Sequence, residues 1–171
     1  MKGYTHVYTG NGKGKTTAAL GLAIRAAGAG LTVFIAQFCK GLDYSELKTL
    51  KLLKDRIQIE QYGKCSFIHG EPCEEDTRLA TEGLIASKEA IKSGKYDVII
   101  LDEVNVAVYF NLISIEDLLD IVDNKPENVE LIITGRYAKK ELIKKSDLVT
   151  RMCEIKHYYK KGIKARKGIE H

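Results

Sequence analysis

Short apolar segments alternate with amphipathic segments along almost the whole chain. Runs rich in β-branched and aromatic residues predict strands, and the clearest of them, 96–101, ends in Val-Ile-Ile-Leu, which is apolar on both faces. Strands are expected at 4–8, 31–37, 56–61, 96–101, 129–134 and 148–155, and helices at 17–27, 45–54, 74–92, 114–122 and 138–145. Strands that alternate with helices form right-handed crossovers between parallel neighbours. The pattern therefore predicts an α/β fold with a mostly parallel central sheet of about six strands and helices on both faces.

The second predicted helix begins with a capping signal. Asp43-Tyr44-Ser45-Glu46 resembles a capping box in which Asp43 is the N-cap residue. This signal predicts that the Asp43 side chain accepts a hydrogen bond from the first turn of the helix.

Composition limits the possibilities further. The chain has 171 residues, of which 44% are hydrophobic and 29% charged, so we expect one ordinary soluble domain spanning 1–171. The net charge of +4 suits an anionic ligand but is weak evidence for nucleic acid. The chain begins without an apolar signal core, and no apolar run approaches the length that spans a bilayer. The expected location is therefore the cytoplasm, without membrane contact.

The strongest chemical signal lies between the first predicted strand and the first predicted helix. This stretch is Gly-rich and ends in Gly-Lys-Thr, as phosphate-binding loops do, although Thr9 stands where the first glycine is usual. Glycines let backbone N–H groups point toward an anion, and the helix N-terminus adds positive potential. Lys15 would contact the phosphates, and the Thr16 hydroxyl would bind Mg²⁺. The expected nucleotide-binding residues of the loop are Thr9, Gly10, Asn11, Gly12, Lys13, Gly14, Lys15, Thr16 and Thr17.

Two acidic residues directly follow the apolar strand 96–101. Ligands of open α/β sheets bind at the carboxyl ends of the strands, and nucleoside triphosphatases place the carboxylate that holds Mg²⁺ at such a strand end. We therefore expect Thr16, Asp102 and Glu103 to form the metal site. With the phosphate loop, this arrangement indicates a P-loop NTPase-like (RecA-like) fold.

Polar residues also follow two further predicted strands. Lys40, shortly after Gln37, is placed to contact phosphate, and Arg136 is placed to neutralise the charge of a triphosphate. Each could equally be an ordinary surface residue. The residues alone thus indicate an Mg²⁺-dependent nucleotide-binding α/β protein and name no second substrate.

One spacing is compatible with a different metal site. Cys65, His69 and Cys73 recur every four residues, and with a fourth ligand they could hold a metal. However, Gly70 and Pro72 would break a helix that aligned them, so reduced free thiols are the favoured interpretation.

The tail, 156–171, is basic and interleaves lysines with aromatic residues. Such a run can bind nucleic acid. A solvated surface, or a segment packed on or near the nucleotide site, is the favoured interpretation, and no nucleic-acid partner is expected.

These motifs resemble, in the same order, those of the P-loop type ATP:corrinoid adenosyltransferases, which act on cob(I)alamin or cob(I)yrinic acid a,c-diamide. The resemblance extends over nearly the whole chain. It rests on 9–17, Gln37-Phe38, Lys40-Gly41, Leu101-Asp102-Glu103 and Ile133-Thr134-Gly135-Arg136, and in the tail on Lys156-His157, Gly162-Ile163-Lys164-Ala165 and Gly168-Ile169.

The resemblance implies that the Co(I) form of a corrinoid attacks the 5′ carbon of the ATP ribose, so that the adenosyl group moves to cobalt and tripolyphosphate leaves. It implies that the loop binds the nucleotide in the reversed direction, which exposes the ribose carbon. It assigns catalysis to Lys15, Thr16 and Glu103. It also implies Mg²⁺ and ATP as cofactor and co-substrate, a reductase or flavoprotein that supplies Co(I), and a homodimer.

The sequence departs from the family in two respects. Family members usually carry a Phe and a Trp after the third strand, in a loop associated with displacing the lower axial ligand of cobalt, but this chain has no Trp. Phe67, with Tyr62, is expected to supply the aromatic wall for the corrinoid instead. The chain also begins almost at the first strand, whereas family members with an N-terminal extension use it to cover the active site. Either another segment is expected to close the site, or the site stays more open until substrate arrives.

Two alternative functions use the same residues differently. A P-loop ATPase or kinase would use Glu103 as a base toward water or a hydroxyl, and would release ADP without any corrinoid. A corrinoid carrier or sensor would bind ATP as a signal without turnover, although a passive carrier needs no complete set of Mg²⁺ ligands.

Overall fold

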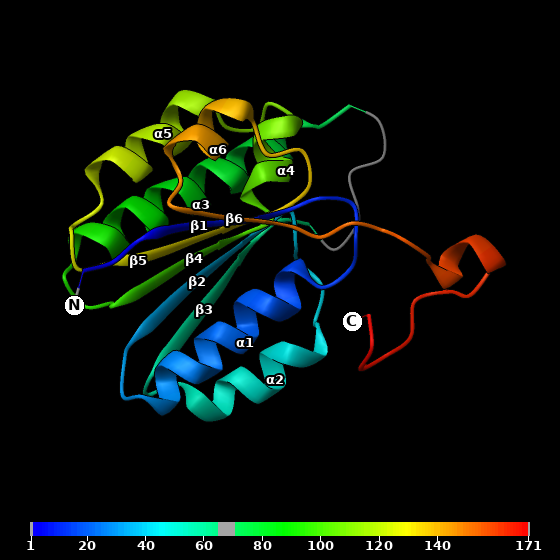
Figure 1. Ribbon diagram of the computed structural model, residues 1–171, viewed down its shortest axis with the longest axis horizontal. Coiled ribbons are helices and arrows are strands. Elements are labelled where there is room, and N and C mark those ends of the chain that lie inside the picture. The colour runs from blue at the N-terminus through cyan, green and yellow to red at the C-terminus, as the bar shows by residue number, and fades with distance from the viewer. Residues whose placement is uncertain (1, 65–70, 171) are drawn as a thin grey trace.

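The computed structural model describes residues 2–64 and 71–170. Its centre is one parallel sheet with the strand order β3-β2-β4-β5-β1-β6 (Figure 1). The strands are β1 (Thr5–Thr9), β2 (Val33–Phe38), β3 (Ile57–Tyr62), β4 (Val98–Asp102), β5 (Glu130–Thr134) and β6 (Leu148–Arg151). The predicted α/β class and the parallel sheet are confirmed.

Helices cover both faces of this sheet, as predicted. The helices are α1 (Lys15–Gly28), α2 (Ser45–Leu50), α3 (Glu74–Lys92), α4 (Val104–Tyr109), α5 (Ile115–Asn124) and α6 (Lys140–Lys145), with short 3-10 turns at Lys51–Leu53 and Tyr158–Lys161. α1 and α2 lie on one face, and the other four lie on the opposite face (Figure 1). None of the helices in the described ranges is long and apolar enough to cross a membrane.

The sheet separates two apolar cores. Alternate residues of the central strands face opposite layers, so Ile100 packs with α1 and Ile99 packs with α3. All five residues of β4 are buried because this strand lies between β2 and β5 and is covered on both faces. The apolar run that predicted this strand therefore reflects its central position.

The structure corrects one predicted cap. α2 begins at Ser45 as expected, but its N-cap residue is Tyr44, which makes no side-chain capping bond. The capping box assigned to Asp43 was therefore wrong. The Asp43 carboxylate instead lies 3.3 Å from the Lys48 ammonium, on the exposed side of the helix.

A helix that the pattern did not predict follows β4. The sequence of α4 is rich in valine and favours a strand by propensity. Glu103 adopts a left-handed conformation with φ 59°, which ends the strand and turns the chain into the helix. Burial of Val104, Ala107 and Val108 then stabilises α4, so packing overrides local propensity.

The sixth strand is shorter than predicted. β6 ends at Arg151 and lies at the edge of the sheet, where all four of its residues are exposed. Beyond it, the Met152 carbonyl accepts a hydrogen bond from the Gly12 amide at 2.8 Å. The chain thus leaves the sheet to pack on the loop after β1.

We predict that Gly83 sets the distance between α3 and the sheet. A Cβ atom there would lie 2.7 Å from Cγ of Tyr62 and 2.9 Å from Cε1 of Phe38. Gly83→Ala should therefore lower the free energy of unfolding by about 1–3 kcal/mol. In the control Gly21→Ala, within α1, the methyl group meets no atom within 4 Å, and stability should rise by about 0.5–1 kcal/mol. Urea unfolding measures both, and equal stabilities would contradict this packing.

Candidate active site

The loop between β1 and α1 has the shape of a phosphate-binding loop. Gly14 is left-handed, with φ 113°, and forms the N-cap position from which α1 begins. Gly12 lies so close to the chain after β6 that an added Cβ would be 2.9 Å from the Met152 carbonyl oxygen. Because the first amides of a helix have no intrahelical acceptor, this end of α1 can donate to an anion.

Lys15 is folded over this loop. Its ammonium donates to the Gly12 carbonyl at 2.8 Å, and the residue is only 6% exposed. Burial lowers its pKa, while the nearby Glu103 carboxylate acts in the opposite direction. The lysine charge is therefore held at the loop without a direct ion pair among the described residues.

Asp102, at the end of β4, joins the elements of the site. One carboxylate oxygen accepts hydrogen bonds from the hydroxyls of Thr16 at 2.9 Å and Thr134 at 2.7 Å. The other accepts from the Lys40 ammonium at 2.7 Å and the Gln37 amide at 3.2 Å. The carboxyl edge of the sheet thus brings these residues together, as the strand-end rule predicted.

Asp102 is fully buried and nevertheless has a lowered pKa. Burial opposes its charge, but the ion pair with Lys40 and the hydrogen bonds from Thr134 and Thr16 outweigh it. Lys40 is also within 3.2 Å of the Thr16 hydroxyl, so one cation contacts both the acid and the phosphate loop. Lys40 is therefore not the ordinary surface lysine that the sequence also allowed.

The pKa of Glu103 is shifted in the opposite direction from that of Asp102. Burial and the negative charge of Asp102 raise the pKa of its carboxyl group, and Lys40, Lys15 and Arg136 only partly offset this. Its amide donates to the Thr134 hydroxyl at 2.9 Å, which fixes the backbone at the strained turn. Two adjacent acids therefore differ in their affinity for protons and in their need for a cation.

The other predicted residues lie around this cluster. Arg136 is exposed, and its charge acts on both Lys15 and Glu103. Thr9 is buried, and its hydroxyl lies 3.4 Å from the Ala138 amide. Asn11 and Lys13 are exposed on the loop, and Thr17 is exposed in the first turn of α1.

The aromatic residues expected at the corrinoid are placed only in part. The ring of Tyr62 packs on Phe38 with 6.2 Å between centroids, and its hydroxyl donates to Glu60, so much of this side chain is engaged in the fold. Phe67 lies outside the described residues, as do Cys65 and His69. Cys73 is an exposed free thiol, and the described ranges contain no cluster of three potential His, Cys, Asp or Glu ligands.

Sequence reasoning missed two groups of residues at the site. Thr134 is fully buried and bridges Asp102 and Glu103, but its role depends on β5 lying beside β4, which the sequence does not state. Tyr158 and Glu170 contact Lys13 of the loop, across 145 and 157 residues of sequence. No local pattern could have identified these contacts.

Comparison with known proteins agrees with this geometry. All residues, 1–171, match the family model described as ATP:corrinoid adenosyltransferase BtuR/CobO/CobP. A corrinoid adenosyltransferase of Sinorhizobium sp is 33% identical over 172 residues, which cover 99% of this chain and 80% of that protein. Those of Escherichia coli K12 and Salmonella typhimurium are 31% and 30% identical over 170 residues, covering 99% of this chain and 86% of each relative.

The chain belongs to the ATP:corrinoid adenosyltransferase family. It is accordingly an enzyme, and the resemblance identified from its motifs is confirmed. Apart from those in the tail, the motifs that carried the resemblance lie at one edge of the sheet of this adenosyltransferase, in the loop after β1 and at the ends of β2, β4 and β5.

We predict that Lys40 is required to keep the Asp102 charge in the protein interior. Lys40→Met should lower the free energy of unfolding by about 3–5 kcal/mol, because a buried carboxylate loses its counter-ion. The control is Lys48→Met, which removes an exposed lysine of the following helix and should change stability by less than about 0.5 kcal/mol.

A double variant distinguishes charge from packing. Lys40→Met with Asp102→Asn should be more stable than Lys40→Met alone, because the unpaired charge is gone while an amide oxygen can still accept from Thr16 and Thr134. Denaturant unfolding of the wild type, Lys40→Met, Asp102→Asn and the double variant measures the coupling. A double variant that is less stable than Lys40→Met would show that Asp102 does not depend on Lys40.

Proposed function

We propose that this adenosyltransferase transfers the 5′-deoxyadenosyl group of ATP to the Co(I) centre of cobalamin or a corrinoid precursor, in the synthesis or salvage of adenosylcobalamin. The cobalt supplies both electrons of the new cobalt–carbon bond and is oxidised from Co(I) to Co(III). The bond between C5′ and the triphosphate oxygen breaks, and that electron pair leaves with tripolyphosphate. The observation that carries the proposal is the hydrogen bond between Thr16 and Asp102, in a chain that matches the family from end to end.

The residues of the site fit the demands of this reaction. Co(I) is itself a strong nucleophile, so the protein needs no base to activate it. What the protein must supply is stabilisation of the charge that develops on the leaving triphosphate. Lys15, Arg136 and the first amides of α1 provide positive charge and donors at one place.

The oxygen donors at the edge of the sheet suit Mg²⁺. Mg²⁺ is bound in proteins through one or two carboxylates together with substrate phosphates. The Thr16 hydroxyl and the Asp102 carboxylate are 2.9 Å apart, and Glu103 is the next residue. We infer that these three residues would hold the ion, which when bound neutralises part of the triphosphate charge.

The corrinoid is proposed to approach from the side of the loop after β3. Tyr62 ends β3, and Phe67 follows it in the sequence. Since the Tyr62 ring packs on Phe38, Phe67 is the aromatic residue that we assign to the corrinoid. Aromatic faces cover apolar rings well and help to exclude water from a reacting centre.

Three further features complete the proposal. The described cysteines, Cys39, Cys73 and Cys153, are free thiols, which suits the reducing cytoplasm. A reductase or flavoprotein would provide the electrons that make Co(I). We infer from the family resemblance that the enzyme is a homodimer.

We predict that ATP, Mg²⁺ and chemically reduced cobalamin yield adenosylcobalamin and one equivalent of tripolyphosphate. The visible spectrum follows the cobalt–carbon bond, and ion chromatography identifies the phosphate product. ADP or orthophosphate without adenosylcobalamin would instead indicate phosphoryl transfer by a P-loop ATPase or kinase. Tight binding of both ligands without turnover would indicate a carrier or sensor.

Lys15→Ala should weaken ATP binding about 10- to 100-fold, because a charge-assisted contact to phosphate is lost. Lys54→Ala, at an exposed position after α2, is the matched control and should bind ATP normally. Titration calorimetry measures both affinities. Normal affinity in Lys15→Ala would contradict the assignment of the loop.

Phe67→Ala should slow the reaction with cobalamin while leaving ATP affinity unchanged, because only the corrinoid loses a contact. Tyr4→Ala removes an exposed aromatic residue that precedes β1, at the opposite end of the sheet, and serves as the control. Steady-state rates at varied cobalamin concentration test this. Equal rates in Phe67→Ala and wild type would remove Phe67 from the corrinoid site.

A further inference from the structure

The C-terminal segment returns to the phosphate loop after leaving the sheet. The Met152 amide donates to the Thr9 carbonyl, and the Met152 carbonyl accepts from the Gly12 amide, each at 2.8 Å. The segment then projects away and turns back toward the start of α1 (Figure 1). These two backbone hydrogen bonds hold the start of the C-terminal segment, at Met152, against Thr9 and Gly12 of the loop.

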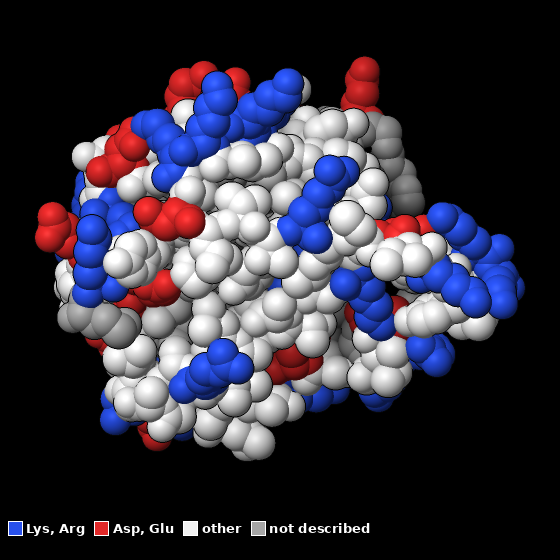
Figure 2. Space-filling model, in the orientation of Figure 1, with Lys and Arg blue, Asp and Glu red and all other residues white. Residues whose placement is uncertain are grey.

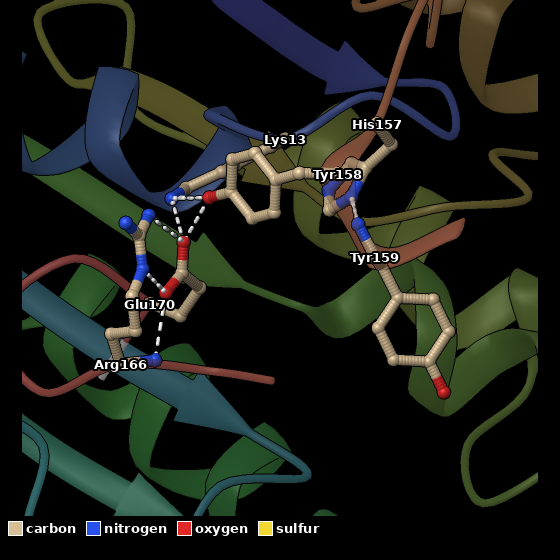
Figure 3. Close-up of polar contacts among 6 residues, drawn as sticks. All are labelled: Lys13, His157, Tyr158, Tyr159, Arg166 and Glu170. Atoms are coloured by element: carbon tan, nitrogen blue, oxygen red, sulfur yellow. Dashed lines mark hydrogen bonds and ion pairs between the residues drawn. The ribbon is translucent and has the colours of Figure 1, made fainter. Parts of the chain in front are cut away.

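At its far end the segment meets Lys13. Figure 3 shows the Lys13 ammonium directed at the Tyr158 hydroxyl and the Glu170 carboxylate, at 3.1 and 2.7 Å. The Tyr158 hydroxyl also contacts that carboxylate. Lys13 is a residue of the phosphate loop itself, so a carboxylate of the protein is bound by a cation that sequence reasoning assigned to the nucleotide.

The donors around the Glu170 carboxylate form a defined set. Arg166 donates its backbone amide at 2.7 Å and two guanidinium nitrogens at 3.3 Å, to both carboxylate oxygens. The Tyr158 ring lies beside both cations, with its centroid 5.8 Å from the Lys13 ammonium and 5.0 Å from the Arg166 guanidinium. We refer to Lys13, Tyr158 and Arg166 together as the anion cluster.

This donor set is one that also binds phosphate. Arginine presents a planar fork that matches two oxygens of a carboxylate or a phosphate, and lysine and a phenol add single donors. The two cations carry more positive charge than the one carboxylate of Glu170 neutralises. A terminal phosphate carries more negative charge and more acceptor oxygens than a carboxylate, so it is the better partner for the anion cluster.

The surroundings add to this preference. Lys156, Lys160, Lys161, Lys164 and Lys167 are exposed on the same segment. Figure 2 shows basic side chains gathered on this projecting part of the molecule. Of these lysines, Lys160 is paired with Glu154 at 2.5 Å, away from the anion cluster. The local potential is therefore positive around the place where Glu170 is bound.

We propose that the anion cluster binds the terminal phosphate of the triphosphate, and that Glu170 is an internal competitor which occupies the cluster until that phosphate displaces it. The identity of the ligand rests on the proposed function. Glu170 is held through the turn in which its amide donates to the Arg166 carbonyl at 2.9 Å. Opening that one turn would move the carboxylate away while the Tyr158 hydroxyl stays on Lys13 and the Arg166 guanidinium stays against the Tyr158 ring. The returning carboxylate would then favour release of tripolyphosphate.

The direct test is equilibrium binding of inorganic tripolyphosphate to the full chain. Glu170→Gln removes the competing charge and should raise the affinity about two- to tenfold, as expected for a half-exposed ion pair. Arg166→Gln should lower the affinity by a similar factor. Glu154→Gln is the matched control, because it removes an acid of the same segment that pairs with Lys160 outside the cluster, and it should bind as wild type does.

Specificity for the terminal phosphate is tested with AMP. None of the three substitutions should change AMP affinity, because AMP lacks the terminal phosphates. Unchanged or weaker tripolyphosphate binding in Glu170→Gln would overturn the proposal, and so would an equal gain in Glu154→Gln. If the wild type makes adenosylcobalamin but the substitutions change tripolyphosphate affinity in none of these ways, the anion cluster is refuted and the proposed function stands.

Proteolysis gives a second, independent measurement. Trypsin cuts after the lysines of 156–167, so the cutting rate reports how firmly the segment is held. Glu170→Gln should be cut faster than wild type without ligand, and tripolyphosphate should slow the cutting by bridging Lys13 and Arg166. If tripolyphosphate leaves the cutting rate of Glu170→Gln unchanged, the ligand does not bind the cluster and the proposal fails.

Discussion

The carboxyl edge of the sheet, where the candidate active site lies, depends on one buried negative charge, that of Asp102. The donors to this carboxylate come from three separate segments: Thr16 from α1, Gln37 and Lys40 from the end of β2 and the turn after it, and Thr134 from β5. A buried charge without partners is very unfavourable, so the acid holds these segments in a fixed relation to one another. The position of α1, and with it the phosphate loop, is therefore set by the same group that we assign to the metal.

The neighbouring acid, Glu103, differs from Asp102 in the direction in which its pKa is shifted. The donors around Asp102 keep it ionised, whereas Glu103 faces that charge with few donors of its own, and burial raises its pKa. A cation that arrived at this edge would relieve the repulsion between the two carboxylates. The proposed Mg²⁺ would therefore meet a pair of acids whose mutual repulsion it lowers, and it would bring positive charge to a leaving group that is highly charged.

Much of this could be predicted from the sequence, because the signals were local. The run at β4 identified a central strand, and the order of glycines, Lys15 and Thr16 identified the loop. α4 was missed because its valines favour a strand until packing on the sheet decides otherwise. Thr134 was missed because its contact with Asp102 depends on which strands are neighbours. The strand order decides which residues far apart in sequence come into contact, and the hydrophobic pattern of the sequence does not contain that order.

The phosphate loop is bound from two sides by groups of the protein's own chain. On the inner side Thr16 donates to Asp102, and on the outer side Lys13 donates to Glu170. In both places a loop residue expected to serve the nucleotide already has a carboxylate partner. Such partners keep the loop in one shape before substrate arrives, and they oppose tight retention of a polyanion afterwards. An enzyme whose product is an intact tripolyphosphate must release that polyanion at every turnover, and internal carboxylates that rebind the same donors lower the free energy that release requires.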